Sequence, residues 1–505
     1  MSAIARIFSA QPDILGATLV AVETDVSRGL HSFSIVGLPG KAIEEARDRI
    51  AAAVRHSGFA SPKSKNHKIV ISLAPADLKK EGPLFDVPMA LGYLLAAEEI
   101  TADTTNKLFV GELGLDGTVR PIRGVLTIAK CAVRAGITDV FVPLENIAEA
   151  ALVEGLRVFG IPSLHALVRH LDHTREDHVL IPRASITEAV TPVRDTAILF
   201  EDIRGQESAK RGLIIAAAGR HNSLMIGPPG TGKTMLARAF EGILPPLTRD
   251  EALEVTAIHS VAGLLGQQLV AHAPFRAPHH TASHTSLVGG GTHPRPGEVT
   301  LAHRGVLFLD EFPEFERRSI DALRQPLEDR VVRVSRVAGT ATFPADFILL
   351  AAMNPHRGGF ESGDVIDQVT DEYRKKISGP ILDRIDLSLS VNHIDPEILS
   401  KQRTRMGESA SAQALVSKAR TRQHERLAGR AARSNAEMTA RDIEETITLT
   451  SEVRELLTTS ATKLSLSPRS IHRTLKVART IADLDDAQTI KMEHLLEALQ
   501  YRVRL

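Results

Sequence analysis

The sequence predicts a multidomain α/β protein made of an α+β domain, a parallel-sheet domain and an α-helical domain. Its 505 residues are more than one hydrophobic core usually organises. Strongly apolar strand-like runs alternate with helical stretches in the middle of the chain, which indicates a parallel sheet covered by helices. The last part is helical and rich in charge. With 43% apolar and 24% charged residues, the composition is that of an ordinary globular protein.

The N-terminal part, residues 1–172, alternates short β-like runs such as TLVAVE and KIVISL with helical ones. The strand-and-helix alternation becomes regular from Ile14 onward. One helix is predicted from about Lys41 to His56, because Ile43 and Val54 fall on the same face. This pattern is typical of a compact α+β domain.

Residues 173–199 lose this periodicity and are predicted to form a linker between domains. Residues 200–393 contain the runs NSLMIG, GVLFLD and DFILLAAMN, which predict three buried strands of a parallel sheet. Residues 394–505 contain no convincing strand pattern, and a separate helical lid domain is expected there.

Charge and cysteine content restrict the possible partners and the compartment. Basic and acidic residues balance at 61 each, so nucleic-acid contact would have to come from local basic patches. Cys131 is the only cysteine, which excludes an intramolecular disulfide and a cysteine-cluster metal site. We therefore expect a reducing, cytoplasmic setting. No leader peptide and no run of membrane-spanning length is recognisable, so no membrane partner is expected.

The clearest motif is GPPGTGKT at residues 227–234, which follows a β-run and precedes a helical one. Glycines in this pattern allow backbone N–H groups to converge on phosphates, and the following helix N-terminus adds partial positive charge. Lys233 is expected to reach the β- and γ-phosphates of ATP, and Thr234 to bind Mg²⁺. The predicted nucleotide-binding residues of the loop are Gly227, Pro228, Pro229, Gly230, Thr231, Gly232, Lys233, Thr234 and Met235.

A second motif, VLFLDE, ends at Asp310 and Glu311. A buried strand that ends in two acids exposes carboxylates at the edge where open α/β sheets bind ligands. Asp310 is expected to hold Mg²⁺ and Glu311 to polarise the attacking water. Together, the two motifs predict an ATP-hydrolysing P-loop enzyme.

Long stretches of the chain resemble the magnesium-chelatase-like AAA+ ATPases, and among them the YifB/ComM family. The similar stretches are RAPHHT, PRPGEVTLAHRGVLFLDEFPEF, LRQPLEDR, AAMNP, SGPILDRID and SIHRTLKVARTIADL. The resemblance implies that Asn354 is a sensor residue that positions water, Arg384 an arginine finger and Arg469 a second sensor. It also implies that Gly205 and Gln206 close over the adenine. In this family the finger comes from a neighbouring subunit, so the resemblance implies a ring, most simply a homohexamer.

The N-terminal domain resembles the Lon-protease fold in the stretches KKEGPLFDVPMAL and GELGLDGTVRPIRGV, followed by AGI. Leu84 stands where the protease needs its nucleophilic serine, and Leu126 where it needs its lysine. Leucine cannot attack a carbonyl. We therefore expect a domain that binds or scaffolds and has no peptidase activity.

Metal binding other than Mg²⁺ is not expected. Relatives carry a cysteine-rich, zinc-binding type of insert after the residue equivalent to Asn354, and this chain has no cysteine there. His279, His280 and His284, with His272 nearby, could in principle bind a metal. A structural or substrate-facing loop is the favoured interpretation, because suitable partner ligands are missing.

Residues 330–343 predict a β-hairpin with a turn at Ala338–Gly339 and with Arg330, Arg333 and Arg336 on the first arm. In related ring helicases a hairpin at this place enters the central channel. The arginines would then track a phosphate backbone. A solvated edge hairpin whose charges oppose aggregation is the alternative.

The leading hypothesis is a ring-forming ATP-driven motor that acts on single-stranded or branched DNA, as ComM-like branch-migration helicases do in recombination. A chaperone-like remodeller of protein partners is one alternative. A chelatase-type motor that drives Mg²⁺ insertion into a porphyrin is another, which the Lon-like domain disfavours.

Overall fold

A computed structural model describes residues 4–14, 16–184, 198–265, 269–290, 295–336, 339–354, 377, 379–395 and 407–502. The chain forms two compact units. The first contains Met1–Pro192 and Ala252–Val270, and the second Val193–Glu251 and Ala271–Leu505. Residues 252–270 thus belong with the N-terminal unit although they lie within the stretch predicted to be the ATPase domain, and the C-terminal helices belong with the second unit.

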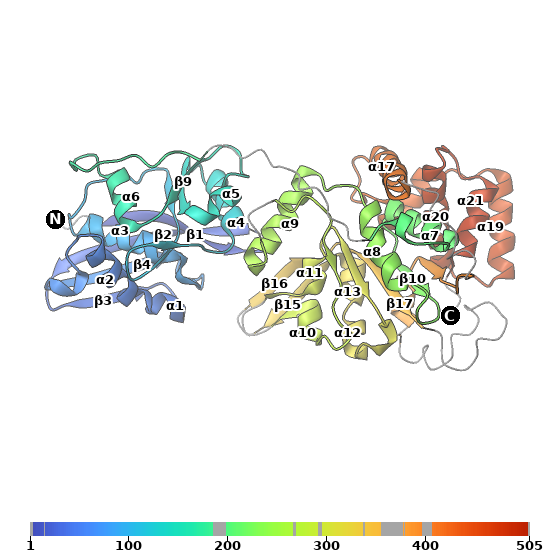
Figure 1. The fold of residues 1–505 in the computed structure, drawn as a ribbon, viewed down its shortest axis with the longest axis horizontal. Coiled ribbons are helices and arrows are strands. Elements are labelled where there is room, and N and C mark those ends of the chain that lie inside the picture. Colours follow the sequence, from blue (N-terminus) through green and yellow to red (C-terminus); the bar gives the residue numbers. More distant parts are fainter. Residues whose placement is uncertain are drawn as a thin grey trace. The chain divides into compact units, whose positions relative to one another are not determined.

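The first unit is built on a seven-stranded mixed sheet with the order β3-β4-β2-β1-β5-β8-β9 (Figure 1). Its strands are β1 (Ala5–Asp13), β2 (Gly16–Arg28), β3 (Ser32–Val36), β4 (His67–Ala74), β5 (Lys107–Phe109), β8 (Asp139–Pro143) and β9 (Arg157–Ile161), with a small ribbon of β6 (Glu112–Leu113) and β7 (Val119–Arg120). β1 pairs antiparallel with β2 along its whole length. The regular alternation was expected from Ile14 onward, but a nine-residue strand, β1, already precedes that residue.

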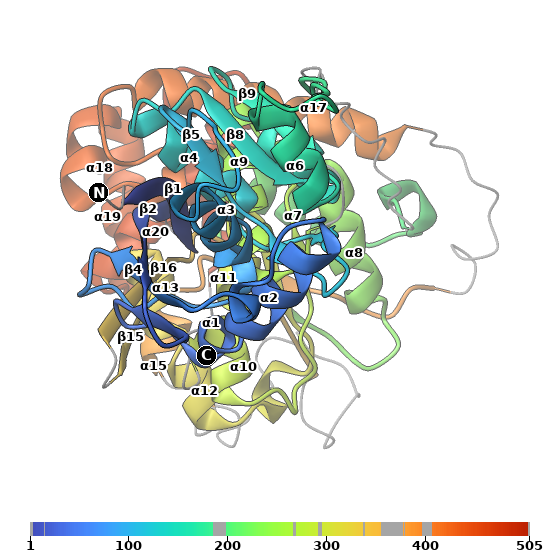
Figure 2. The same cartoon turned by 90° about the vertical axis from the view of Figure 1, so that its left-hand side faces the viewer.

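The helices of this unit are α1 (Lys41–Glu44), α2 (Ala46–His56), α3 (Asp86–Ala96), α4 (Val125–Arg134), α5 (Ile147–Ala150) and α6 (Leu164–Leu171). α3 and α4 pack on β1 and β2 (Figure 2). The helix predicted from Lys41 to His56 is divided at Glu45 into α1 and α2. Ile43 and Val54 are fully buried, as the helical periodicity required.

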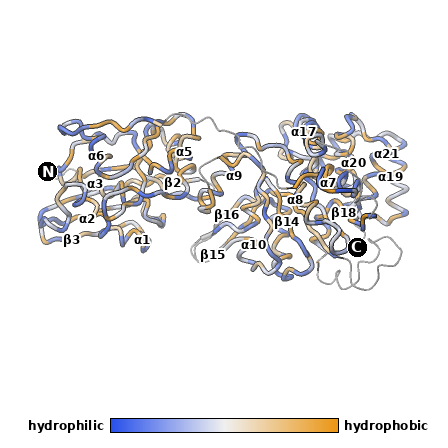
Figure 3. The backbone as a smooth tube through the Cα atoms, viewed as in Figure 1, coloured by the Kyte–Doolittle hydropathy of each residue, from blue (hydrophilic) through white to orange (hydrophobic). Residues whose placement is uncertain are grey.

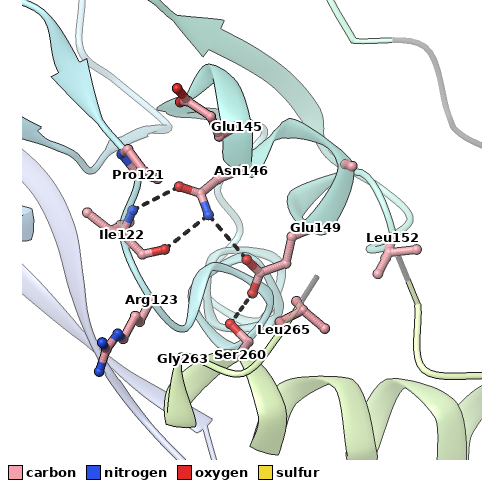
Figure 4. A pocket seen from close by; sticks show the side chains of 11 residues that line it. Pro121, Ile122, Arg123, Glu145, Asn146, Glu149, Leu152, Ser260, Gly263 and Leu265 are labelled. Carbon is pink, nitrogen blue, oxygen red and sulfur yellow. Dashed lines mark hydrogen bonds between the residues drawn. The ribbon is translucent and has the colours of Figure 1, made fainter. Parts of the chain in front are cut away.

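Helix α9 (Arg249–Ala262) brings Ser260 to the N-terminus of α4 (Figure 4). The Ser260 hydroxyl accepts a hydrogen bond from the Gly124 amide at 2.9 Å and donates one to the carboxylate of Glu149. That carboxylate also accepts from the Leu126 amide at 2.8 Å and from Asn146. Burial raises the pKa of Glu149, and these donors oppose the rise. These hydrogen bonds provide partners for a buried carboxylate. They also provide partners for backbone amides at the start of α4, where amides have no acceptor within the helix.

The second unit contains a five-stranded sheet with the order β11-β14-β17-β10-β18, in which every neighbouring pair is parallel. Its strands are β10 (Ser223–Ile226), β11 (Phe275–Arg276), β14 (Val306–Leu309), β17 (Ile348–Met353) and β18 (Leu387–Ser390). The buried runs of β10, β14 and β17 are the three strands predicted from the sequence. This mixed α/β architecture with a large parallel sheet is consistent with a P-loop ATPase.

Helices and two small ribbons surround this sheet. They are α7 (Glu207–Gly219), α8 (Lys233–Ile243), α10 (His284–Val288), α11 (Glu298–Leu301), α12 (Arg317–Asp321), α13 (Arg324–Asp329), α15 (Gly379–Leu382), α17 (Glu408–Arg426), α18 (Ala440–Thr446), α19 (Ser451–Lys463), α20 (Pro468–Leu484) and α21 (Met492–Gln500), with the ribbons β12 (Gly289–Gly290) with β13 (Arg295–Pro296) and β15 (Val331–Arg336) with β16 (Gly339–Pro344). α17 packs against α7, α8 and α20, so one core joins the sheet domain to the C-terminal helices.

Hydrophobic and hydrophilic residues alternate along the chain in both units (Figure 3). Amphipathic elements of this kind bury one face and solvate the other. Within the described residues, no helix has the length and apolar character needed to cross a membrane.

Candidate nucleotide site

The loop at residues 227–232 connects the buried strand β10 to helix α8, which begins at Lys233. A Cβ atom on Gly227 would lie 2.0 Å from the carbonyl oxygen of Val391, so the close approach of the segment after β18 requires glycine there. Gly232 caps α8 with φ +93°, a left-handed conformation that favours glycine. The two glycines therefore have different roles: one is required by packing and the other shapes the turn into the helix.

Lys233 is buried, and its amine makes two polar contacts within the loop and one with Asn354. Nζ donates to the carbonyls of Gly227 and Pro228, both at 2.7 Å, and to Oδ1 of Asn354 at 2.9 Å. Burial lowers the pKa of this amine, and the charges of Asp310 and Glu311 oppose that effect. The cation is thus positioned in advance where the phosphates of a nucleotide would lie.

Thr234 and Asp310 form the second contact of the site. The Thr234 hydroxyl donates to Oδ2 of Asp310 at 2.7 Å. A hydroxyl and a carboxylate, both hard oxygen donors, are the ligand types that Mg²⁺ prefers, and each comes from the end of a different buried element. These two residues and the loop fit a magnesium nucleotide.

The strand order explains why Asn354 joins this group. β17 lies between β10 and β14, in register with both. Its C-terminal end therefore lies between the loop that follows β10 and the acids that follow β14. Asn354, directly after β17, reaches Lys233 as a consequence.

Gly205 and Gln206 precede α7 and both adopt left-handed φ angles, +62° and +61°. The Gln206 amide donates to the carbonyl of Asn392 at 2.6 Å and to that of Thr231 at 3.4 Å. The segment predicted to close over an adenine thus contacts the phosphate loop directly. Met235, on the first turn of α8, is 41% exposed.

Arg384 and Arg469 lie together in a different place. Both line a cavity of about 210 Å³, which also includes Arg473 and Asp383. Asp383 lies 3.8 Å from Arg469 and 3.9 Å from Arg473. Arg384 pairs with Glu328 and donates to the carbonyl of Pro380 at 2.5 Å. Among the described residues that line this cavity, none belongs to the phosphate loop.

The three arginines of the predicted hairpin are not equivalent. Arg330 precedes β15 and forms ion pairs with Asp346 and, at 3.0 Å, with Glu437. Arg333 is exposed, opposite Thr342 in the register. Arg336 pairs through its backbone with Gly339, which is a strand residue and no part of the turn, contrary to the predicted Ala338–Gly339 turn. The connecting residues 337–338 lie outside the described residues.

Arg330 belongs to a buried ionic cluster around Asp346. Arg220 lies 2.9 Å and Arg304 2.7 Å from the carboxylate oxygens of Asp346. Burial alone would raise the pKa of Asp346, but the surrounding arginines lower it far below the ordinary value. The cluster joins the sheet domain to Glu437 of the C-terminal helical part and holds the base of the hairpin.

In the N-terminal unit, Leu84 and Leu126 are both buried, at 5% and 0% exposure. Leu126 lies in the first turn of α4, where its amide is bound by Glu149. The two positions that the Lon resemblance assigns to a nucleophile and its activating amine thus carry packed apolar side chains.

The histidines of the RAPHHT segment are placed by the loop after β11. The His279 ring hydrogen-bonds to the Thr281 hydroxyl at 2.9 Å and lies 4.1 Å, between centroids, from the His280 ring. Nδ1 of His280 lies 3.2 Å from Oε2 of Glu311. Within the part of the chain that the structure describes, no group of three or more His, Cys, Asp or Glu side chains is arranged to hold a metal ion. The contact with Glu311 was not predicted, since 31 positions of sequence with no shared periodicity separate the two residues. Residues 355–376, where relatives carry the cysteine-rich insert and this chain has no cysteine, lie outside the described residues.

Three family models match the chain. Residues 199–399 match "Magnesium chelatase, subunit ChlI", residues 22–146 match "Subunit ChlI of Mg-chelatase", and residues 407–502 match the ChlI C-terminal model. The competence protein ComM of Haemophilus influenzae is 42% identical over 494 residues, which cover 96% of this chain and 95% of that protein. The protein YifB of Escherichia coli is 43% identical over 493 residues, which cover 97% of this chain and 95% of that protein. The magnesium-chelatase 67 kDa subunit of Chlorobaculum parvum is 27% identical over 34% of this chain and 26% of its own.

These similarities, together with the parallel sheet and the phosphate loop, support an AAA+-like motor that uses ATP and Mg²⁺. The match to ComM and YifB extends over nearly the full length of each protein. The chain therefore belongs to the YifB/ComM family of magnesium-chelatase-like proteins.

Proposed function

We propose that this protein is a ring-forming ATPase that moves along DNA, with one ATP site at each subunit interface. The observation that carries the ATPase is the convergence of Lys233, Thr234, Asp310 and Asn354 at one edge of the sheet. Lys233 and Thr234 come from the first turn of α8, Asp310 directly follows β14, and Asn354 directly follows β17.

In this proposal Lys233 neutralises charge on the β- and γ-phosphates, while Thr234 and Asp310 hold Mg²⁺. When bound, Mg²⁺ would supply positive charge that stabilises the charge developing on the phosphates. Glu311 orients a water whose oxygen attacks the γ-phosphorus, as the bond to the leaving ADP oxygen breaks. The proton of that water passes to the Glu311 carboxylate. Asn354, held by Lys233, helps to align the same water.

The arginines are proposed to act on the neighbouring subunit's nucleotide. Arg384 and Arg469 share a cavity that none of the described loop residues lines, so the two guanidinium groups lie close to one another and away from their own phosphate loop. The Arg469 side chain is about half exposed, while that of Arg384 is mostly buried and paired with Glu328. Two planar cations together suit the charge that develops on a transferring phosphoryl group. Arg469 would then act in trans alongside Arg384. A ring, most simply a homohexamer, supplies each site with this surface.

DNA is proposed as the polymer because Arg333 of the β15–β16 hairpin is exposed and because one relative that matches over nearly its full length is named a competence protein. Arg333 is exposed on a short ribbon whose Val332 and Val334 are buried, so its charge faces solvent while the arm is anchored. Arg336 is the second proposed phosphate contact. Arg330 instead anchors the base of the hairpin through Asp346 and Glu437.

The N-terminal unit is proposed to be a Lon-like scaffold without peptidase activity, and the C-terminal helices to be the lid of the ATPase. The buried leucines at positions 84 and 126 support the first proposal. The packing of α17 against α7 and α8 supports the second.

The test is the steady-state ATPase rate with single-stranded, duplex, forked and four-way DNA, measured beside a panel of unfolded proteins and a porphyrin with Mg²⁺. Stimulation that is strongest with branched or single-stranded DNA is expected. Stimulation by unfolded protein alone would instead favour a chaperone-like remodeller, and Mg²⁺ insertion into the porphyrin would favour a chelatase-type motor.

A further inference from the structure

The segment that follows β11 reaches the catalytic edge of the sheet because β11 pairs in parallel with β14. Phe275 is in register with Val306, and Arg276 with Leu307. Both strands therefore end at the same edge, and the chain after Arg276 emerges beside the acids that follow β14. Arg276 is fixed by a two-point ion pair with Glu298, at 2.6 and 2.9 Å. The start of this segment is thus firmly held.

His280 lies on this segment and faces Glu311. The distance from Nδ1 of His280 to Oε2 of Glu311 is 3.2 Å. Glu311 itself has φ +50°, a conformation that L-residues rarely adopt and that turns it out of the line of β14. Strained backbone of this kind is typical of functional positions. The carboxylate is about half exposed, so packing alone does not fix its orientation.

The two residues also share a cavity with the magnesium-side residues. It has a volume of about 280 Å³, and its lining includes Thr234, Arg238, His280, Asp310 and Glu311. The imidazole therefore lies on the side of the site where a water beside the γ-phosphate would be placed. The neighbouring His279 is turned to the Thr281 hydroxyl, and its ring lies 4.1 Å from the His280 ring between centroids, in a tilted arrangement.

We propose that His280 is a positioning residue for ATP hydrolysis, which acts by holding the carboxylate of Glu311. The structure gives Nδ1 of His280 and Oε2 of Glu311 as a charge contact at 3.2 Å. In the nucleotide complex, this contact tightens to a hydrogen bond from the imidazole N–H to Oε2, which leaves Oε1 to receive the proton of the attacking water. A general base oriented by a third group is a recurrent arrangement in hydrolytic sites, and its contacts tighten in the substrate complex. This inference rests on the proposed ATPase function and adds a residue to it.

The geometry allows a sharp set of variants. In asparagine the amide nitrogen is bonded to Cγ, as Nδ1 is in histidine, so His280→Asn keeps a donor near the same point. In glutamine the donor lies one bond farther along the side chain, so His280→Gln does not. His280→Ala removes the donor. His284→Asn, on the first turn of α10, makes the same substitution in the same segment and serves as the control.

The experiment measures kcat and KM for ATP, the equilibrium affinity for a fluorescent ATP analogue and the melting temperature of each variant. We expect His280→Ala and His280→Gln to lower kcat about 10- to 100-fold, because a misplaced catalytic group costs about that much. Nucleotide affinity and melting temperature should stay at wild-type values. His280→Asn should keep kcat within about threefold of wild type, and His284→Asn should not change it.

The same substitutions made on a Glu311→Gln background, followed in single-turnover hydrolysis, separate the mechanism from a merely local effect. If His280 acts through Glu311, His280→Ala does not lower further the slow residual single-turnover rate that Glu311→Gln retains. An unchanged or increased kcat in His280→Ala, or an undiminished loss on the Glu311→Gln background, overturns the proposal while leaving the ATPase intact. A wild-type protein without any ATPase activity overturns the proposed function and His280 with it.

Discussion

The amine of Lys233 lies 2.9 Å from Oδ1 of Asn354, across 121 positions of sequence. Lys233 opens helix α8 after β10, and Asn354 directly follows β17, the strand next to β10. The contact links the cation expected to bind phosphate with the amide expected to align water. It also means that a change at either residue affects the other, which bears on how variants of this site should be interpreted.

Lys233→Ala should abolish hydrolysis and weaken ATP binding, because the phosphates lose the amine that the loop holds ready. Glu311→Gln should keep ATP bound and stop turnover, because only proton acceptance is lost. ATP affinity by fluorescence and single-turnover hydrolysis distinguish the two. Glu316→Gln, an exposed acid in the same segment, is the control and should retain activity. Equal loss of binding in both Lys233→Ala and Glu311→Gln would show that the roles are assigned incorrectly.

A shared active site predicts complementation between subunits. Arg384→Ala and Lys233→Ala should each be nearly inactive, and mixing them should restore part of the activity. Restoration is expected because some interfaces then combine an intact loop with an intact finger. Subunit exchange is first confirmed by labelling.

The matched control mixes Lys233→Ala with Glu311→Gln. Both changes affect the same side of the interface, so no mixed site is whole and activity should stay absent. If exchange occurs and the mixture with Arg384→Ala is equally inactive at all ratios, Arg384 does not act in trans.

DNA affinity should fall steeply with salt, because contacts with phosphates release counterions. Arg333→Ala with Arg336→Ala should make the slope of log K against log salt shallower by about 0.7 per lost contact on a single strand. The matched variant with lysine at both positions keeps the charge and should keep the slope. An unchanged slope in the alanine variant would remove this hairpin from the DNA path.

Asp346→Asn should reduce the free energy of unfolding at pH 7 by about 3 kcal/mol, since it leaves several buried arginines without their shared partner. Asp321→Asn, which breaks the more exposed pair with Arg324, should cost less than about 1 kcal/mol. Both values come from denaturant unfolding followed by circular dichroism. An equal effect in the two variants would contradict the role of the Asp346 cluster.

The same residue predicts a pH dependence. The folded-state pKa of Asp346 is lowered, so its stabilising effect is complete above its unfolded pKa of about 4 and is lost as the pH falls below that value. The difference in unfolding free energy between wild type and Asp346→Asn should therefore stay constant from about pH 5 to about pH 8. It should become smaller only below about pH 4, where the carboxylate of the unfolded chain is protonated. A difference that changes near neutral pH would point to another group.

No peptidase activity is expected from the N-terminal unit, because its Leu84 and Leu126 are packed in apolar surroundings. Incubation of purified protein with unstructured casein should leave the casein intact. Cleavage that a mutation in this unit abolishes would overturn the expectation. Elemental analysis should find no stoichiometric zinc.

The sequence alone determined the parts of the protein that depend on local pattern. The buried runs of β10, β14 and β17 were readable because parallel strands covered on both faces are continuously apolar. Lys233, Thr234, Asp310 and Glu311 could be selected as a nucleotide site because their motifs have fixed spacing next to those strands. The buried face of the helix predicted at Lys41–His56 was correct. The break at Glu45 was not predicted, because no proline or glycine marks it.

Tertiary structure decided what depends on which segments meet. The insertion of β17 between β10 and β14 brings Asn354 to Lys233, and strand order is not encoded in any local periodicity. The same holds for the pairing of β11 with β14, which places His280 beside Glu311. It also holds for the ion pair with Asp346, which ties Arg330 into a buried cluster and so distinguishes it from the exposed Arg333. Residues 252–270 belong with the N-terminal unit because Ser260 satisfies a buried acid and a helix end there. Such contacts arise from long-range packing and the need to satisfy buried polar groups, which one-dimensional patterns do not contain.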